Sequence, residues 1–248
     1  MKNNNLIFII FMIGTFTVGM AEYVVTGLLT QIANDMHVSI SNAGLLISVY
    51  AISVAIIGPF MRIATINYSA KKLLPILVGI FIVSNVIGML APNFYVLLLS
   101  RLLSAAMHAP FFGVCMSVAA TIAPPAKKTQ AIALVQAGLT IAVMIGVPFG
   151  SFLGSFTNWR TVFGIMVLLA VITFIGVLKF TPNVSLSTEA NIKDELKVFK
   201  NPHILIIIAI IVFGFSGVFT SYTFMEPMIH EFAPFKTVGL TDVYLCLV

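Results

Sequence analysis

Long apolar runs separated by short polar segments fill the chain from residue 6 to residue 225. A helix needs about 20 mostly apolar residues to cross the hydrocarbon core of a bilayer. The pattern therefore predicts seven membrane-spanning helices, at residues 6–30, 43–62, 72–92, 95–118, 131–156, 161–180 and 203–225. Most connections between them are short, so consecutive helices are expected to lie side by side as antiparallel neighbours in a bundle.

One polar segment, residues 181–202, is longer than the other connections. Its stretch EANIKDELKVFK has amphipathic helical spacing, with Ile192, Leu196 and Phe199 on one face. We expect a connector helix on the cytoplasmic membrane surface, with a partner-binding segment as the alternative. The chain then divides into a six-helix N-terminal domain (1–180), a cytoplasmic linker (181–202), and the first helix and outer loop of an incomplete C-terminal domain (203–248). This organisation is typical of one half of a two-part transporter and the start of the other.

Composition supports a location in the bilayer. The chain is 60% hydrophobic and 8% charged, whereas a soluble domain carries about 25% charged residues. The two cysteines, Cys115 and Cys246, suggest neither a disulfide framework nor a metal site. The N-terminus lacks a small-residue cleavage signal, so the first helix is expected to be retained.

The basic residues predict the orientation of the helices. With the N-terminus inside, ten of the 13 lysines and arginines fall on the cytoplasmic side, two fall outside, and Arg101 lies within the membrane. Positive residues favour cytoplasmic loops, so the N-terminus is predicted to be cytoplasmic.

Three ionisable residues are predicted at membrane depth, where charges are rare and often functional. Glu22 in the first span and Arg101 in the fourth each lie about eight residues inside the outer end, or about 12 Å deep. His108 lies two turns below Arg101 on the same helix face. These residues could meet in a wettable cleft and exchange protons, because burial and neighbouring charges both tune titration. The alternative is a structural Glu22–Arg101 ion pair with His108 hydrogen-bonded in the packing.

Small and hydroxylic residues extend the predicted cleft. In the first span Thr15, Gly19, Glu22 and Thr26 share one helical face. In the seventh span Ser216, Thr220 and Thr223 follow helical spacing, although such hydroxyls often bond only to carbonyls of their own helix.

The fifth predicted span carries a small residue every four positions. These residues are Gly138, Ala142, Gly146, Gly150 and Gly154, with Pro148 inside the ridge. Small residues at this spacing let helix backbones approach closely, and the proline permits a kink. The ridge is expected to pack tightly, either as a static contact or as a bendable surface along which another helix slides.

Several motifs together resemble the major facilitator superfamily, in particular its drug:proton antiporter branch and the bacterial efflux permeases for sugars, purines and chloramphenicol. RLLSAAMHAPFFGV, with Arg101 and His108, resembles the family's helix 4 motif, and GVPFGSFLG resembles its antiporter motif of helix 5. NWRTVF resembles the WR..F that follows in this branch, and AEYVVTGLLTQIA resembles TEFVIMGLLPEIA around the helix 1 acid. VSISNAGLLISVYA resembles the entry into helix 2. Taken together, these motifs give a resemblance that runs from about residue 14 to residue 180.

The resemblance implies an all-α integral membrane protein with a twelve-helix fold of two six-helix halves, of which this chain carries the N-terminal bundle plus helix 7. It further implies proton-coupled efflux of a small amphiphilic molecule by alternating access across a bacterial cell membrane. Glu22, Arg101 and His108 would serve proton coupling, and the glycine ridge would serve the antiporter motif. A facilitator without proton coupling is the alternative within the fold.

Two features depart from the family pattern. The loop between helices 2 and 3 carries Ile66 and Asn67 where an aspartate–arginine pair is usual, and only Gly58, Pro59, Lys71 and Lys72 keep the motif's character. The fold needs about 400 residues and this chain has 248. A truncated, non-transporting remnant or fragment is therefore the main alternative function, with the missing C-terminal half as a possible partner.

An enzyme is not expected. The chain has no H-E-x-x-H, G-x-S-x-G or Walker sequence, and Asp35, Asp194 and Asp242 all fall in predicted loops. A channel is disfavoured because no filter-like loop repeats. No cofactor, metal or nucleic acid is predicted, and the expected partners are a small-molecule substrate, protons and the lipid bilayer.

Overall fold

The computed structural model describes residues 2–65, 68–184, 201–224 and 227–228. Seven segments in these ranges are helical, long and apolar enough to cross a membrane, which confirms the seven predicted spans. In chain order they are α1 (Lys2–Tyr23) with η1 (Val24–Leu28) and α2 (Leu29–Asp35); α3 (Ile40–Thr65); α4 (Ala70–Met89); α5 (Phe94–Ile122); η2 (Pro125–Lys127) with α6 (Lys128–Ile141), η3 (Ala142–Gly146) and α7 (Val147–Phe156); α8 (Trp159–Phe180); and α10 (Pro202–Thr223).

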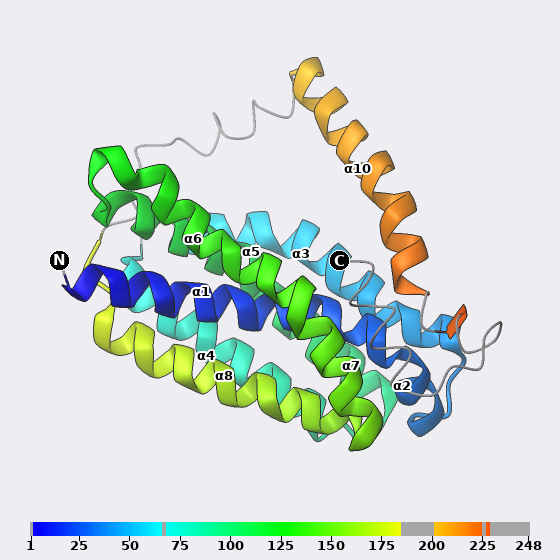
Figure 1. Cartoon of the computed structure of the whole chain (residues 1–248). Coiled ribbons are helices and arrows are strands. Elements are labelled where there is room, and N and C mark those ends of the chain that lie inside the picture. Colours follow the sequence, from blue (N-terminus) through cyan, green and yellow to red (C-terminus); the bar gives the residue numbers. More distant parts are fainter. Residues whose placement is uncertain (1, 66–67, 185–200, 225–226, 229–248) are drawn as a thin grey trace.

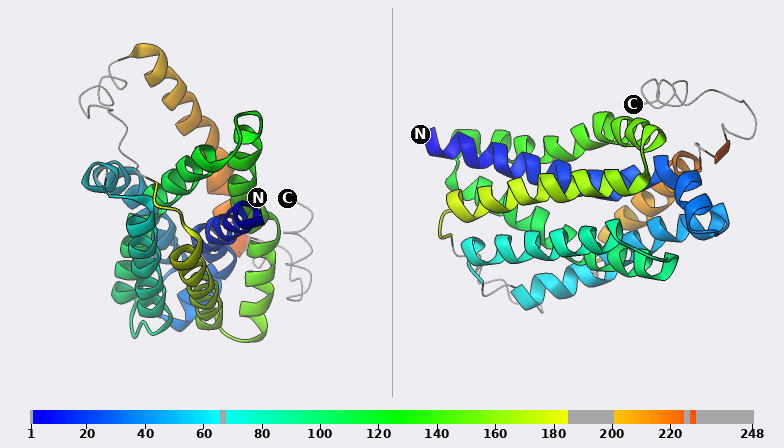
Figure 2. Two further views of the ribbon diagram at one scale, coloured as in Figure 1. Left: turned by 90° about the vertical axis from the view of Figure 1, so that its left-hand side faces the viewer. Right: turned by 90° about the horizontal axis from the view of Figure 1, so that it is seen from below.

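The first six spans lie side by side as one elongated bundle (Figure 1). Helix α1 runs through it and packs against α6 and α8, while α5 packs against α3, α4 and α6. Helix α10 is inclined to the bundle and stands apart from it along most of its length, as Figure 2 also shows from two further directions. The core residues come from the six bundled spans, because the apolar residues of α10 from Leu205 to Phe213 are largely exposed.

Asparagines begin two of the spans after tight turns. The side chain of Asn93 accepts a hydrogen bond from the backbone N–H of Val96 at 3.0 Å, and Asn158 accepts from Arg160 at 2.9 Å. Each asparagine therefore satisfies an amide at the start of a helix that has no partner within that helix. The connections APN and TNW in the sequence correspond to these two helix starts.

The helices extend beyond several of the predicted edges. The first span continues to Asp35 through the 3-10 turn η1, and α3 continues to Thr65. The assignment of Gly58 and Pro59 to the loop between the second and third spans was therefore wrong, since both lie inside α3. A proline that follows many apolar residues does not end a membrane helix, because neighbouring groups can satisfy the freed carbonyl.

Some predicted features lie outside the described residues. They include the amphipathic stretch of the linker, Ile66, Asn67 and Cys246. Lys71 and Lys72 are exposed in the first turn of α4, and Cys115 is a buried free thiol.

Candidate functional site

A cavity of about 290 Å³ lies where α10 meets the bundle. It is lined by Glu22, Tyr23 and Thr26 of the first span, Ile47, Tyr50 and Ala51 of α3, and Phe219 and Thr223 of α10. This volume is near the lower end of the range for small-molecule sites, about 300–1,000 Å³. Its wall combines apolar and aromatic side chains with one carboxylate and two threonines, a composition that suits a small amphiphilic molecule.

Two aromatic rings join α10 to the first span at this cavity. Tyr23 and Phe219 stack with ring centroids 5.7 Å apart and an angle of 29° between their planes. Both rings also line the cavity, so the contact that holds α10 here forms part of the cavity wall.

Glu22 and His108 lie close together beside the cavity. His108 Nε2 is 3.8 Å from Glu22 Oε2, and the two side chains are 14% and 28% exposed. The other ring nitrogen, Nδ1, is 2.9 Å from the Tyr50 hydroxyl. The direction of this hydrogen bond depends on the histidine: a neutral ring with its proton on Nε2 accepts from the hydroxyl, whereas a protonated ring donates to it. The three residues form a chain in which one proton can occupy different positions.

The predicted contact between Glu22 and Arg101 is not present as an ion pair in the described part of the chain, where His108 is the residue paired with Glu22. The Arg101 guanidinium instead lies over the Tyr50 ring, with Cζ 4.2 Å from the ring centroid. Arg101 is 1% exposed, and none of its three guanidinium nitrogens has a hydrogen-bond partner among the described residues. Glu22 and Arg101 were predicted at the same depth in the membrane, but equal depth does not make them partners. Tyr50 of α3 lies against the Arg101 guanidinium instead.

Helix α5 supplies both basic residues of the site. Arg101 and His108 are two turns apart, and both contact Tyr50, the cation through the ring face and the imidazole through the hydroxyl. The predicted common face of these residues is therefore observed. Tyr50 itself was missed by the sequence analysis, and its only signal was a polar hydroxyl in an otherwise apolar run.

The structure places the predicted cleft residues in two groups. Thr26 and Thr223 line the cavity. Thr15 and Gly19 do not, because Thr15 Oγ1 donates to the carbonyl of Val135 and a Cβ at Gly19 would meet Leu139 and Ala142. They lie outside this cavity because the fifth span covers the face that they form.

The helix 7 hydroxyls at Ser216 and Thr220 do not line this cavity, and their place in the substrate cleft stays a prediction. Both side chains are exposed, and they donate to the carbonyls of Phe213 and Ser216 in their own helix, at 3.1 and 2.7 Å. Of the three predicted positions in this span, Thr223 alone is in the cavity wall.

The small-residue ridge faces the first span. All its members are buried, namely Gly138, Ala142, Gly146, Pro148, Gly150 and Gly154. A Cβ on Gly138 would come within 2.2 Å of the Met12 carbonyl oxygen, and one on Gly150 would come within 2.2 Å of a Val24 methyl. The helix widens to a π-helical turn, η3, in the middle of this ridge. Such turns often accompany functional sites, but a role of the ridge in antiport stays a prediction.

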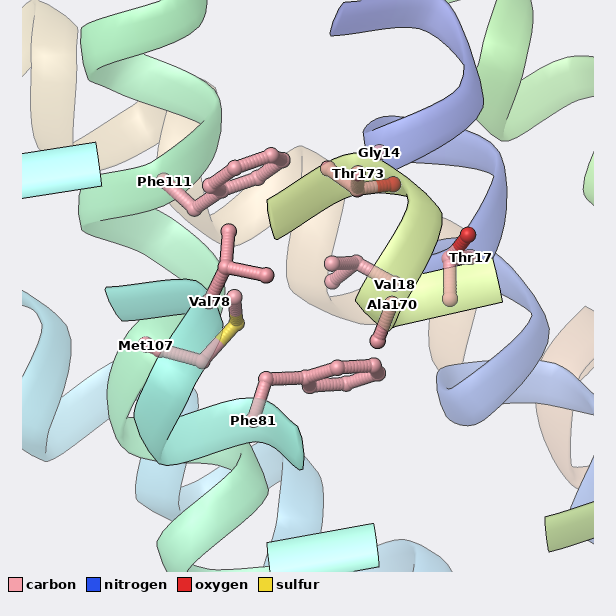
Figure 3. A pocket seen from close by; sticks show the side chains of 9 residues that line it. All are labelled: Gly14, Thr17, Val18, Val78, Phe81, Met107, Phe111, Ala170 and Thr173. Carbon is pink, nitrogen blue, oxygen red and sulfur yellow. The ribbon is translucent and has the colours of Figure 1, made fainter. Parts of the chain in front are cut away.

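A second, much smaller cavity lies inside the bundle between the first span, α4, α5 and α8. Its volume is about 10 Å³, room for a single water molecule at most. Figure 3 shows its lining, in which Thr17 and Thr173 are the residues with hydroxyl groups. These hydroxyls donate to the carbonyls of Ile13 and Leu169, so neither has its donor left for a ligand. It is a packing void.

A second charged cluster lies at the end of the bundle where the first span finishes. The Arg160 guanidinium donates to Asp35 Oδ2 and, at 3.2 Å, to the carbonyl of Ala91. Trp159 Nε1 donates to the same Asp35 oxygen at 3.1 Å. The cluster ties three connections together: the end of α2, the turn before α5 and the start of α8. Asp35 was predicted in a loop from the sequence, and this contact was not predicted.

The helices and the cavity together define a multi-pass α-helical membrane protein. Residues 11–246 match the family model of the Major Facilitator Superfamily, and the chain belongs to this family. It is similar to the uncharacterized MFS-type transporter YfhI of Bacillus subtilis (strain 168), with 47% identity over 97% of this chain and 61% of that protein. It is also similar to the inner membrane transport protein YdhP of Escherichia coli (strain K12), with 33% identity over 95% of this chain and 60% of that protein.

A solved structure shares the fold. The crystal structure of a bacterial homologue of the human lysosomal transporter Spinster, inward-facing and unoccupied, aligns with a TM-score of 0.76 at 17% sequence identity. The alignment covers 98% of this chain and 58% of that one. The chain thus spans about three fifths of the length of the relatives it matches.

Proposed function

We propose that this chain takes part in proton-coupled efflux of a small amphiphilic molecule by alternating access. Membership of a family of membrane transporters supports the general activity. The observation that carries the proton-coupled form is the position of Glu22, whose carboxylate lies in the cavity wall and 3.8 Å from His108.

Glu22 and His108 are the groups assigned to proton exchange. A carboxylate and an imidazole can each take up or release a proton as burial and neighbouring charges change, and a proton shared by the pair changes the charge of the cavity wall. A cationic or polar substrate group near Glu22 competes with that proton, so that substrate binding releases it. Arg101 supplies a fixed positive charge on the far side of Tyr50 and thereby favours one proton rather than two on the pair.

The cavity wall supports the substrate class. Stacked Tyr23 and Phe219 offer apolar contact. Thr223 offers a hydroxyl, and Thr26 offers an acceptor oxygen, since its hydroxyl donates to the carbonyl of Tyr23 at 2.7 Å. A molecule with an aromatic or alicyclic body and a few polar groups matches this wall and the volume of about 290 Å³.

The proposed setting is a bacterial plasma membrane with the N-terminus in the cytoplasm. The excess of lysine and arginine in the even-numbered connections supports this orientation. The cluster of Asp35 and Arg160 would then lie at the outer surface. Segments corresponding to the remaining length of the relatives would complete the second half of the transporter.

Proton exchange in everted membrane vesicles tests the proposal. The 248-residue chain is expressed, respiration acidifies the vesicle lumen, and fluorescence recovery of a pH-sensitive dye is followed after addition of chloramphenicol, arabinose or adenine. We expect recovery with at least one compound and none in Glu22→Gln vesicles. Asp35→Asn is the matched control, since it makes the same carboxylate-to-amide change outside the cavity and should retain exchange.

Two results would contradict this function. Accumulation that is unchanged when the proton gradient is collapsed would favour a facilitator. A lack of response to all three compounds, at equal protein level and alongside an active antiporter, would favour the non-transporting alternative.

A further inference from the structure

The most unusual group in the described part of the chain is the Arg101 guanidinium. It is buried, and all three of its nitrogens lack a hydrogen-bond partner among the described residues. A guanidinium carries five N–H donors, and a buried charge without partners is strongly unfavourable. The ring of Tyr50 beneath it offers attraction to the cation but no acceptor for these donors. The observed arrangement therefore leaves most of the binding capacity of Arg101 unused.

Tyr50 separates Arg101 from the cavity. Its side chain is part of the cavity wall, whereas Arg101 is not, and its ring lies directly against the guanidinium. The ring is held by the 2.9 Å hydrogen bond between its hydroxyl and His108 Nδ1. The Tyr50 ring also meets the His108 ring edge-on, with centroids 5.8 Å apart, so displacement of the ring breaks the hydrogen bond and the edge contact to His108 as well as the contact with Arg101.

We propose that Arg101 is a concealed anion-binding residue, and that displacement of the Tyr50 ring opens it to the carboxylate of a molecule in the cavity. A planar guanidinium binds carboxylates through two parallel hydrogen bonds, which would satisfy the donors that are unpaired here. The charge of the ligand would neutralise the buried cation at the same time.

The inference rests on the proposed function in one respect, because it uses the cavity assigned to substrate. It adds amphiphiles with a carboxylate to the molecules that the cavity can bind. Glu22 lines the same cavity and is the nearby carboxylate that could instead occupy Arg101. The geometry favours an external ligand, because Glu22 is already next to His108.

Arginine labelling tests the concealment without any transport assay. Purified chain in detergent is treated with phenylglyoxal, and modification of each arginine is followed by mass spectrometry, with the partly exposed Arg160 as internal reference. We expect slow modification of Arg101 in the unaltered chain. Tyr50→Phe keeps the ring but loses the hydrogen bond, so modification should accelerate about two- to tenfold, the effect of one hydrogen bond. Tyr95→Phe removes an exposed hydroxyl elsewhere on α5 and should change nothing.

Protection by a small carboxylate tests the anion site. Benzoate should slow the modification of Arg101 in Tyr50→Phe without affecting Arg160, and neutral benzamide should not. Equal protection by both compounds, or the same rate for Arg101 in Tyr50→Phe and the unaltered chain, would overturn the proposal. Faster modification in Glu22→Gln without benzoate protection would assign the anion position to Glu22 and overturn it as well. Because these readouts need no substrate flux, they can succeed or fail independently of the vesicle assay.

Discussion

The hydroxyl of Thr15 donates a 2.6 Å hydrogen bond to the carbonyl oxygen of Val135, a residue 120 positions away. This bond joins α1 to α6 at the point where Gly138 brings the two backbones together. The polar residues of the first span therefore have two different surroundings. Thr15 and Gly19 pack against the fifth span, whereas Glu22 and Thr26 line the cavity.

Replacing Thr15 by valine should destabilise the bundle modestly. The change keeps the volume and removes the bond to Val135, and hydrogen bonds between membrane helices contribute about 0.6 kcal/mol on average. The free energy of unfolding in mixed detergent micelles measures the effect. Thr17→Val is the matched control, because the Thr17 hydroxyl bonds only to Ile13 in its own helix among the contacts described. An equal loss in both variants would show that the interhelical bond contributes nothing specific.

An alanine at Gly138 should have a larger effect. Its Cβ would meet the carbonyl of Met12 and the hydroxyl of Thr15 at 2.2 Å, so the helices must separate. Overpacking of this kind costs about 1–3 kcal/mol. The same micelle assay measures it, with Gly113→Ala as control, since a Cβ there meets nothing within 4 Å. Unchanged stability of Gly138→Ala would mean that the close approach of α1 and α6 is not required.

The pair formed by Asp35 and Arg160 should contribute only slightly to stability. Both side chains are about one third exposed, at 38% and 33%, and exposed ion pairs contribute about 0.2–1 kcal/mol. A double-mutant cycle with Asp35→Asn and Arg160→Gln measures the coupling, which should shrink in 1 M KCl because salt screens exposed charges. A coupling that does not respond to salt would contradict a solvent-exposed ion pair.

Two substitutions at His108 separate its contacts. His108→Asn places an amide near the Nδ1 position facing Tyr50, and His108→Gln places one near Nε2 facing Glu22. Neither amide titrates, so both variants should lose proton exchange in the vesicle assay while remaining folded. Retention of exchange in either variant would remove His108 from the proton path and leave Glu22 to act alone.

The effect of a substitution at Arg101 on proton-coupled exchange should depend on whether the positive charge is kept. Arg101→Ala should abolish proton-coupled exchange, and Arg101→Lys should reduce it less, because a lysine ammonium can still lie over the Tyr50 ring. Exchange rates at equal protein level in the membrane give the comparison. Normal exchange by the alanine variant would exclude a coupling role for this cation.

The length of the apolar runs was sufficient to predict the seven spans, because a bilayer requires a continuous apolar helix long enough to cross it. The two-turn spacing of Arg101 and His108 likewise placed them on one face, since helical geometry is local. Helix edges were less predictable: α3 continues through Pro59 to Thr65, and the first span continues through a 3-10 turn to Asp35. These ends depend on neighbouring helices rather than on the residues at the boundary.

The sequence by itself determined the class of protein, the family motifs and the ionisable residues at membrane depth. The tertiary structure decided which of those residues meet. It paired Glu22 with His108 instead of Arg101, placed Tyr50 between the cation and the cavity, and turned Thr15 and Gly19 toward α6. The physical reason is that helical spacing defines a face, but only the packing of separate helices determines whether that face meets a cavity, a ring or another backbone.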